Sequence, residues 1–159
     1  MAFFVKGEKI VLKKDATWEA DGVEITHDQT RELFFRSVHW DENEKKYFLE
    51  VGYEHMFIEV EDTAVFVTAL EQADSQGLRA KLSNAADAPI KADQLQYRDG
   101  NLYLSLSDGQ KAKFLSAPYY DLLKRLQEDE RYYFLTIGGN RANLSSKEQG
   151  RPGAKKQSG

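Results

Sequence analysis

The sequence predicts an α+β fold in which one antiparallel-sheet-plus-helix unit is built twice. An Asp-Gly turn, a helix-like run and an aromatic strand segment follow one another near the start of the 159-residue chain and again near its end. From Asp21 to Phe48 is 27 positions, and from Asp108 to Phe134 is 26. A repeat this long indicates one structural unit built twice. Interfaces between the copies of such a unit favour ligand pockets.

The first half of the chain is predicted to hold short strands around one helix. Alternating apolar and polar residues predict strands over 3–5, 10–12, 17–19, 23–25, 47–51, 56–60, 64–70 and 78–82. Asp21-Gly22 marks a hairpin turn, because this tight turn needs positive φ. Thr26 and Gln29 have the capping-box spacing, which predicts a helix that runs through about Val38. A charged loop over 41–46 follows it.

The second half repeats this plan. Strands are predicted over 95–97, 102–106, 111–115 and 132–137, with Asp-Gly turns after the first two. Ser116 is predicted to cap a second helix, and Pro118 fits its first turn. The spacing of an amphipathic helix that packs on a sheet is shared by Tyr119, Leu122, Leu123 and Leu126.

The segment 85–89 is the predicted boundary between the two halves. Residues 1–84 then form an N-terminal sheet and helix subdomain, and residues 85–144 form a C-terminal barrel-like subdomain with a helix. Residues 145–159 are polar and poor in apolar side chains, which predicts a disordered tail.

Composition and charge exclude several classes of function. The chain has no cysteine, so disulfides, thiolate catalysis and Cys-ligated metal sites are impossible. The formal net charge is -4, and because the tail from Ser146 contributes about +3, the rest carries about -7. A body that acidic is a poor general partner for nucleic acid. No apolar run reaches the length of a membrane span or a signal-peptide core, so we expect a cytoplasmic protein without membrane partners.

No residue pattern predicts a catalytic site, a metal centre or a cofactor. The three histidines form no His-x-x-x-His pair and are expected in surface or structural roles. No serine lies in a nucleophile elbow, and Gly138-Gly139 lacks the spacing of a phosphate loop. The aromatic side chains are expected to pack in the core rather than to stack on bases. These aromatics are Trp18, Tyr47, Phe48, Tyr119, Tyr120, Tyr132 and Tyr133.

A group of carboxylates is predicted where one strand ends. Glu59, Glu61 and Asp62 lie close together in the sequence, and Glu54 precedes them. Paired carboxylates can do acid–base work or hold a cation. The alternative is a turn over 61–63, in which an aspartate hydrogen-bonds its own backbone.

Several segments between Trp18 and Leu126 carry a family resemblance. They are Trp18, 32–35, 47–49, Glu54, 58–66, Asn84 with Asp87, and 118–122. Together they resemble the bacterial family of domains of unknown function 1285. The most specific segment is 58–66, which reads Ile-Glu-Val-Glu-Asp-Thr-Ala-Val-Phe, and the resemblance covers about two thirds of the chain.

The resemblance implies a duplicated α+β core whose second half is like a small pleckstrin-homology barrel. It also implies a ligand site between the halves for a nucleotide-like molecule, in signal transduction or a stress response, without established enzymatic activity. The ligand-binding candidates that match the family pattern are Glu54, Glu61, Asp62, Asn84 and Tyr119. The chain departs from the pattern at Gly52-Tyr53, where proline is expected, and at His55 and Phe57, where basic residues are expected.

Three functions are compatible with these sequence features. The first is a non-enzymatic module for a small ligand, in which Asn84 reads a hydrogen-bonding edge and a tyrosine stacks; Asn84→Ala and Glu61→Gln then weaken binding while the fold survives. The second is a protein–protein interaction module whose open sheet edge accepts an extended strand. The third is an enzyme in which Glu54, Glu61 and Asp62 surround a cation.

Overall fold

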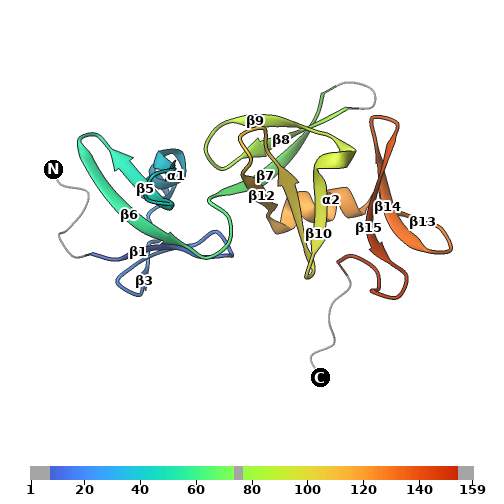
Figure 1. Cartoon of the computed structure of the whole chain (residues 1–159), viewed down its shortest axis with the longest axis horizontal. Coiled ribbons are helices and arrows are strands. Elements are labelled where there is room, and N and C mark those ends of the chain that lie inside the picture. Colours follow the sequence, from blue (N-terminus) through green and yellow to red (C-terminus); the bar gives the residue numbers. More distant parts are fainter. Residues whose placement is uncertain (1–7, 74–76, 154–159) are drawn as a thin grey trace. The chain divides into compact units, whose positions relative to one another are not determined.

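The computed structural model describes residues 8–73 and 77–153, and within them the fold is mixed α+β. It contains two six-stranded sheets, one three-stranded sheet and two α-helices, whose order along the chain is shown in Figure 1. The expected strand at 3–5 lies outside the described residues. The chain divides into two compact units. The first runs to Phe66 and includes Ser83–Ala85, and the second comprises Val67–Leu82 and the chain from Ala86.

The first unit is built on a six-stranded sheet with the order β3-β2-β1-β6-β5-β4. Its strands are β1 (Ile10–Leu12), β2 (Trp18–Ala20), β3 (Val23–Glu24), β4 (Val38–Asp41), β5 (Lys46–Val51) and β6 (Glu54–Val60). Neighbours pair antiparallel except β1 and β6, which run parallel with Val11 opposite Glu59. The β1–β6 pair therefore joins two antiparallel meanders into one sheet. The turn between β2 and β3 has positive φ at Asp21 and Gly22, as its sequence predicts.

Helix α1 (Asp28–Ser37) connects the two meanders of the first unit. The sequence predicts a cap at Thr26, but the cap is His27, whose Nδ1 accepts the amide of Thr30 at 3.3 Å. The helix ends because Val38 is extended, with φ -79° and ψ 130°. Val38 already belongs to β4. This strand was not predicted, because a helix was expected up to about Val38 and a charged loop over 41–46.

Aromatic rings fill the core of the first unit. Trp18 is fully buried, and its ring makes edge contacts with Phe34 and Phe35 at centroid distances of 5.4 Å. Phe35 in turn packs edge-on against Phe66 at 6.0 Å. Each such pair contributes about 0.5–1.5 kcal/mol beyond the area that it buries. The predicted core position of Trp18 is confirmed.

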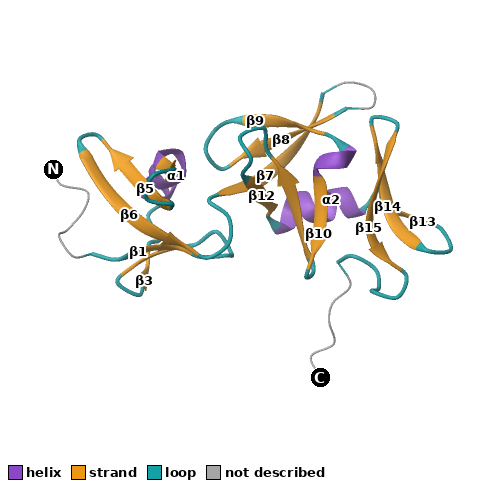
Figure 2. Ribbon diagram, viewed as in Figure 1, coloured by secondary structure: helices purple, strands orange, loops and turns teal. Residues whose placement is uncertain are grey.

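The second unit contains a six-stranded sheet and a separate three-stranded sheet, with the orders β10-β11-β12-β7-β8-β9 and β13-β14-β15. The elements are β7 (Val65–Gln72), β8 (Leu78–Leu82), β9 (Asp87–Ile90), the 3-10 helix η1 (Ala92–Gln94), β10 (Leu95–Arg98), β11 (Asn101–Ser105), β12 (Lys111–Phe114), α2 (Ser116–Leu123), β13 (Gln127–Glu128), β14 (Tyr132–Ile137) and β15 (Asn140–Ser146). Figure 2 shows how the larger sheet curls as a half-barrel. Ser116 is the first residue of α2 rather than its cap, and Leu115 holds the cap position.

The same order of elements occurs in both units. Three antiparallel strands, a helix and three more antiparallel strands follow one another as β1-β2-β3-α1-β4-β5-β6 and as β10-β11-β12-α2-β13-β14-β15. Strands β5 and β14 share the same alternation of exposed and buried residues, with Leu49 and Val51 matching Leu135 and Ile137. This order agrees with the duplicated antiparallel-sheet-plus-helix unit that the sequence predicts.

Two predicted boundaries differ from the structure. The division at 84–85 fails because β7 from Val67 onward and β8 belong to the second unit, and only Ser83–Ala85 return to the first. The disordered tail predicted from 145 is wrong over the described residues to 153, because β15 reaches Ser146. Ser145 is buried, and its hydroxyl donates to the carbonyl of Gly150 at 2.8 Å.

Candidate functional site

The predicted ligand-binding residues are distributed over both units. Glu54, Glu61, Asp62 and Asn84 belong to the first unit, and Tyr119 belongs to the second. Glu54 begins β6, Glu61 and Asp62 follow that strand, and Asn84 lies in the turn after β8. Three of the four candidates in the first unit therefore flank one strand.

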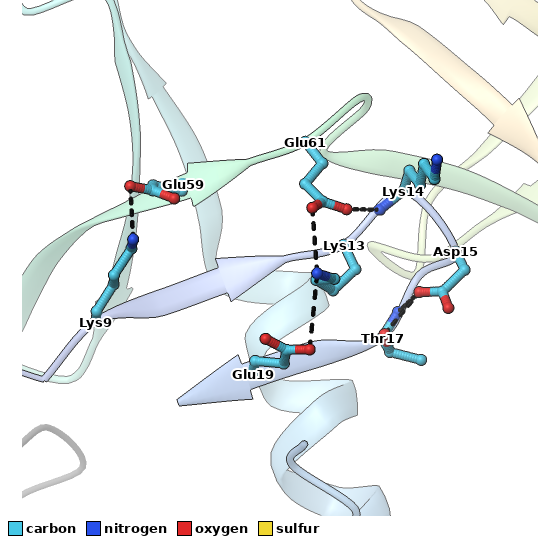
Figure 3. Close-up of polar contacts among 8 residues, drawn as sticks. All are labelled: Lys9, Lys13, Lys14, Asp15, Thr17, Glu19, Glu59 and Glu61. Atoms are coloured by element: carbon cyan, nitrogen blue, oxygen red, sulfur yellow. Dashed lines mark hydrogen bonds and ion pairs between the residues drawn. The ribbon is translucent and has the colours of Figure 1, made fainter. Parts of the chain in front are cut away.

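Glu61 is held by the loop between β1 and β2 (Figure 3). Its Oε1 accepts the backbone N–H of Lys14 at 2.9 Å, and its Oε2 lies 3.2 Å from Nζ of Lys13. The Lys14 amide and the Lys13 ammonium together hold the pKa of the Glu61 carboxyl below its usual range. The hydrogen bond from Lys13 to Glu61 also raises the pKa of Lys13, which lies 3.8 Å from Glu19 as well. Both carboxylate oxygens of Glu61 are therefore engaged within its own unit.

The loop that receives Glu61 has internal contacts of its own. Asp15 Oδ1 accepts the hydroxyl of Thr17 at 2.6 Å and its amide at 3.1 Å. The Thr17 hydroxyl lowers the pKa of the Asp15 carboxyl. Along the same pair of strands, Lys9 and Glu59 form an ion pair at 3.3 Å (Figure 3). This network ties β1 to β6, the parallel pair that joins the two meanders, and we assign it a structural role.

The carboxylates do not gather into a metal site. Among the residues that the structure describes, no group of three or more His, Asp or Glu side chains is arranged to hold a metal ion. Glu54, Glu61 and Asp62 therefore form no such group in the described chain, and an enzyme that depends on them stays an untested alternative. Asp62 instead lies in the bend between β6 and β7, in agreement with the predicted turn.

Tyr119 is a packing residue of the second unit. It is buried in α2, and its hydroxyl donates to the carbonyl of Gly100 at 3.1 Å. Burial raises the pKa of Tyr119, so the phenol stays neutral. Its ring also lies 5.5 Å from that of Tyr120. The core position predicted for Tyr119 is confirmed, and its predicted contact with a ligand stays a prediction.

A second candidate site lies on the outer face of β4, β5 and β6. His39, Phe48 and Phe57 are opposite one another on the three strands, and His55 precedes Phe57 by two residues on the same face. The centroid of the Phe48 ring is 4.3 Å from that of His55 and 5.4 Å from that of His39. Phe57 is 42% exposed. We call these four residues the aromatic–histidine face.

Charged residues border the aromatic–histidine face. Lys46 Nζ lies 5.4 Å from the centroid of the Phe57 ring, and Glu50 is opposite His55. The first unit has eight Lys and Arg against fifteen Asp and Glu, so its net charge is -7. The face thus offers flat rings for stacking and imidazoles that donate or accept hydrogen bonds, in acidic surroundings.

Sequence patterns do not reveal this face. Phe48 was expected in the core but is half-buried, and the three histidines share no motif that would link them. The available signal was the alternation in β6, where the burial of Ile58 leaves His55 and Phe57 on the other face. His39 and Phe57 lie on either side of Phe48 because of the register in which β4, β5 and β6 pair, and this register cannot be read from the sequence.

Solved structures share this architecture. A DUF1285 family protein from Silicibacter pomeroyi DSS-3 is 18% identical, with 89% of this chain and 81% of that chain covered and a TM-score of 0.65. A DUF1285 family protein from Shewanella baltica OS155 is 21% identical, with 76% of this chain and 94% of that chain covered and a TM-score of 0.57. The fold is that of the DUF1285 family. No family model matches the sequence, and no curated protein matches it.

The DUF1285 fold confirms the resemblance that the sequence shows. The structure also shows where the residues that depart from the family pattern lie. His55 and Phe57, which stand where basic residues are expected, both lie in the aromatic–histidine face. The substitutions therefore change a surface rather than the core.

In the described part of the chain, no helix combines the length and the apolar character that crossing a bilayer requires.

Proposed function

We propose that this chain is a non-enzymatic module that binds a small planar, nucleotide-like ligand on the aromatic–histidine face. The observation that supports the proposal is the exposed group of rings around Phe48, with His55 at 4.3 Å and Phe57 at 6.4 Å. A flat ligand gains about 1–3 kcal/mol from stacking on such a ring. The imidazoles of His39 and His55 supply donors and acceptors that give the ligand its orientation.

The charge of the first unit narrows the class of ligand. A net charge of -7 repels a polyphosphate, while the bordering cations are already engaged, Lys9 with Glu59 and Lys46 with the ring of Phe57. We therefore favour a nucleoside-like ring with little negative charge. Adenosine and guanosine are the first probes, with ATP and GTP as their charged counterparts.

Further parts of the proposal rest on the family resemblance. Glu54, Asp62 and Asn84 remain predicted ligand contacts in the first unit, and Asn84 is half-buried in its turn. The second unit, in which α2 directly follows the six-stranded sheet, is the proposed pleckstrin-homology-like part. Signal transduction or a stress response in the cytoplasm is the proposed setting.

A thermal-unfolding screen against nucleosides, nucleotides and cyclic dinucleotides tests the ligand proposal. A ligand at a hundredfold excess over its Kd adds about 2.7 kcal/mol to the free energy of unfolding, which raises Tm visibly. We expect this shift with a nucleoside and its loss in Phe57→Ala. Tyr132→Ala is the matched control, because Tyr132 is an exposed aromatic of the second unit, 39% exposed against 42% for Phe57.

Two results contradict the proposal. One is a ligand that shifts Tm equally in the wild type and in Phe57→Ala, which places its contacts elsewhere. The other is a shift with ATP but not with adenosine, which shows that phosphate rather than the ring is recognised. If phosphate is recognised, Asn84→Ala is the next variant to compare.

A protein-interaction module is the second candidate function. It is favoured by the open edge of β4, the last strand in the sheet of the first unit, and by the exposure of Trp40 on that strand. If a protein partner is released by the small ligand, the two functions belong to one mechanism.

A further inference from the structure

The edge strands of the described sheets are protected to different degrees. Edges expose unpaired backbone groups, and proteins blunt them with short strands, proline, lysine or a covering element. Strands β3 and β13 have two residues each, β9 contains Pro89, and β10 and β15 lie against each other. Strand β4 has four residues, with neither proline nor lysine. Within the described ranges, it is the edge best suited to pair with another strand.

Both sides of β4 offer side chains to an added strand. His39 lies on the aromatic–histidine face, whereas Trp40 lies on the opposite side beside Tyr47, with ring centroids 4.8 Å apart. Trp40 is 40% exposed, and its Nε1 donates to Glu42 at 2.7 Å, which fixes the orientation of the ring. Residues of a paired strand alternate between the two sides, so one set meets His39 and the other meets Trp40.

The charge near β4 selects the chemistry of the partner. The strand ends in an acidic turn, in which Asp41, Glu42 and Glu44 outnumber Lys45 and Lys46. Asp41 Oδ1 accepts the amides of Asn43 and Glu44 at 2.9 and 3.0 Å, and Lys45 pairs with Glu42. The unit around this turn has a net charge of -7. Complementary charge favours a basic partner strand and disfavours an acidic one.

We propose that β4 is the docking edge for an extended, basic segment of a partner protein, which adds a seventh strand to the sheet of the first unit. Backbone hydrogen bonds to β4 supply affinity, and an apolar residue of the partner packs on Trp40. Lysine or arginine of the partner meets the acidic turn. This inference rests on the second candidate function and deepens it, because it names the edge, the aromatic anchor and the charge of the partner. It does not require the proposed nucleoside ligand, so the peptide experiment and the thermal-unfolding screen can fail independently.

Selection from a library of random peptides of about ten residues, displayed on phage and panned on the immobilised full chain, tests the proposal. We expect enrichment of sequences in which lysine or arginine alternates with β-branched residues, as strands favour. A synthetic peptide of this kind slows amide hydrogen exchange at β4, and its affinity falls as salt is added. Trp40→Ser weakens its binding about tenfold, the usual effect of losing an aromatic anchor. Val23→Ser, on the opposite edge strand β3, leaves binding unchanged.

Backbone-methylated peptides separate strand addition from docking of side chains alone. One peptide carries N-methyl groups on its odd residues and another on its even residues, so one of the two cannot pair with β4. We expect that one of them loses binding to the wild-type chain. Equal binding of both, enrichment of acidic peptides, no enrichment, or protection at another edge overturns the proposal.

Discussion

Phe48 in β5 and Phe134 in β14 occupy the same place in the two repeated units, yet their neighbours differ. His39 and Phe57 stand opposite Phe48 on the adjacent strands. The rings lie against one another, and two of the three side chains are exposed. The first unit thus presents a group of rings to its surroundings.

The second unit covers the equivalent ring. Gln127 and Asn143 stand opposite Phe134, and the guanidinium of Arg141 lies 3.6 Å from the centroid of its ring. Arg141 is held in turn by an ion pair with Asp129. The repeated motif therefore does not require a row of rings at this position, and the aromatic–histidine face has no counterpart around Phe134.

The units also differ in charge and in sheet pairing. The first carries -7, whereas the second has fourteen Lys and Arg against eleven Asp and Glu, a net +3. In the first unit, pairing of β1 with β6 merges both meanders into one sheet. In the second, β12 has β7 as its other neighbour, and the last three strands form a sheet of their own. The repeated motif thus forms two three-stranded meanders in both units. Whether these meanders join in one sheet depends on the strands with which they pair.

The largest expected effect comes from the shared core of β5 and β14. Leu49 is 0% exposed and Leu135 is 1% exposed. Leu49→Ala and Leu135→Ala should each lower the free energy of unfolding by about 2–5 kcal/mol, from lost burial and the cavity that remains. Denaturant unfolding measures the cost, and hydrogen exchange shows which unit loosens. If one of the two variants lowers the free energy of unfolding by less than about 1 kcal/mol, β5 and β14 are not equivalent core strands.

The turns after these strands give a smaller test. Gly52 has φ of 60° and Gly138 has φ of 57°, and no atom lies within 4 Å of an added Cβ at either position. Gly52→Ala and Gly138→Ala should therefore each cost about 1–2 kcal/mol from left-handed backbone strain alone. Thermal unfolding measures it, and the asparagine variants, which tolerate this conformation better, are the controls. Equal costs for alanine and asparagine would falsify the strain argument.

Exchanging residues across the repeat sharpens the contrast between the two faces. Phe57→Asn gives the first unit the side chain that Asn143 supplies in the second. We expect a change in unfolding free energy below about 1 kcal/mol, because the site is exposed and the strand persists. Binding of a planar ring, followed by the aromatic signals of Phe48 in NMR spectra, should be lost. Retained binding places the ligand outside the aromatic–histidine face.

The smallest effect concerns the ion pair that covers Phe134. Arg141, together with the amides of Arg131 and Tyr132, lowers the pKa of Asp129 to about 2 from 3.8. Its stabilising contribution is present above the unfolded value and is lost as pH falls through the folded one. Asp129→Asn should therefore be slightly less stable than the wild type near neutral pH. The difference should close between about pH 4 and pH 2 in unfolding titrations, and a constant difference contradicts this cause.

Local signals predicted the parts of the fold that depend on local chemistry. Asp21-Gly22 specified its turn, and β8 and β14 begin and end where their alternation predicts. Strand β15 was missed because its Asn140–Ser146 sequence is polar, and only pairing with β14 makes it a strand. Strand β4 was missed because it follows α1 without a turn.

The candidate site was harder to predict, because it depends on contacts between distant residues. The sequence selected Glu61 but not its partner Lys13, which lies 48 positions earlier and approaches only through the β1–β6 pairing. It placed Tyr119 correctly in a core. It could not show that His39, Phe48 and Phe57 share one row, since that row is set by strand register.

Strand β7 has a consequence for any attempt to separate the two units. It begins in the first unit at Val65 and continues in the second from Val67. The chain then returns for Ser83–Ala85, where the amide of Ser83 donates to the carbonyl of Phe66 at 2.9 Å. The chain therefore crosses from one unit to the other three times, and no single cleavage separates the two complete units. Cleavage at any one crossing therefore leaves residues of one unit on the same fragment as the other unit, and a continuous gene fragment that encodes one unit either omits some of its residues or includes residues of the other.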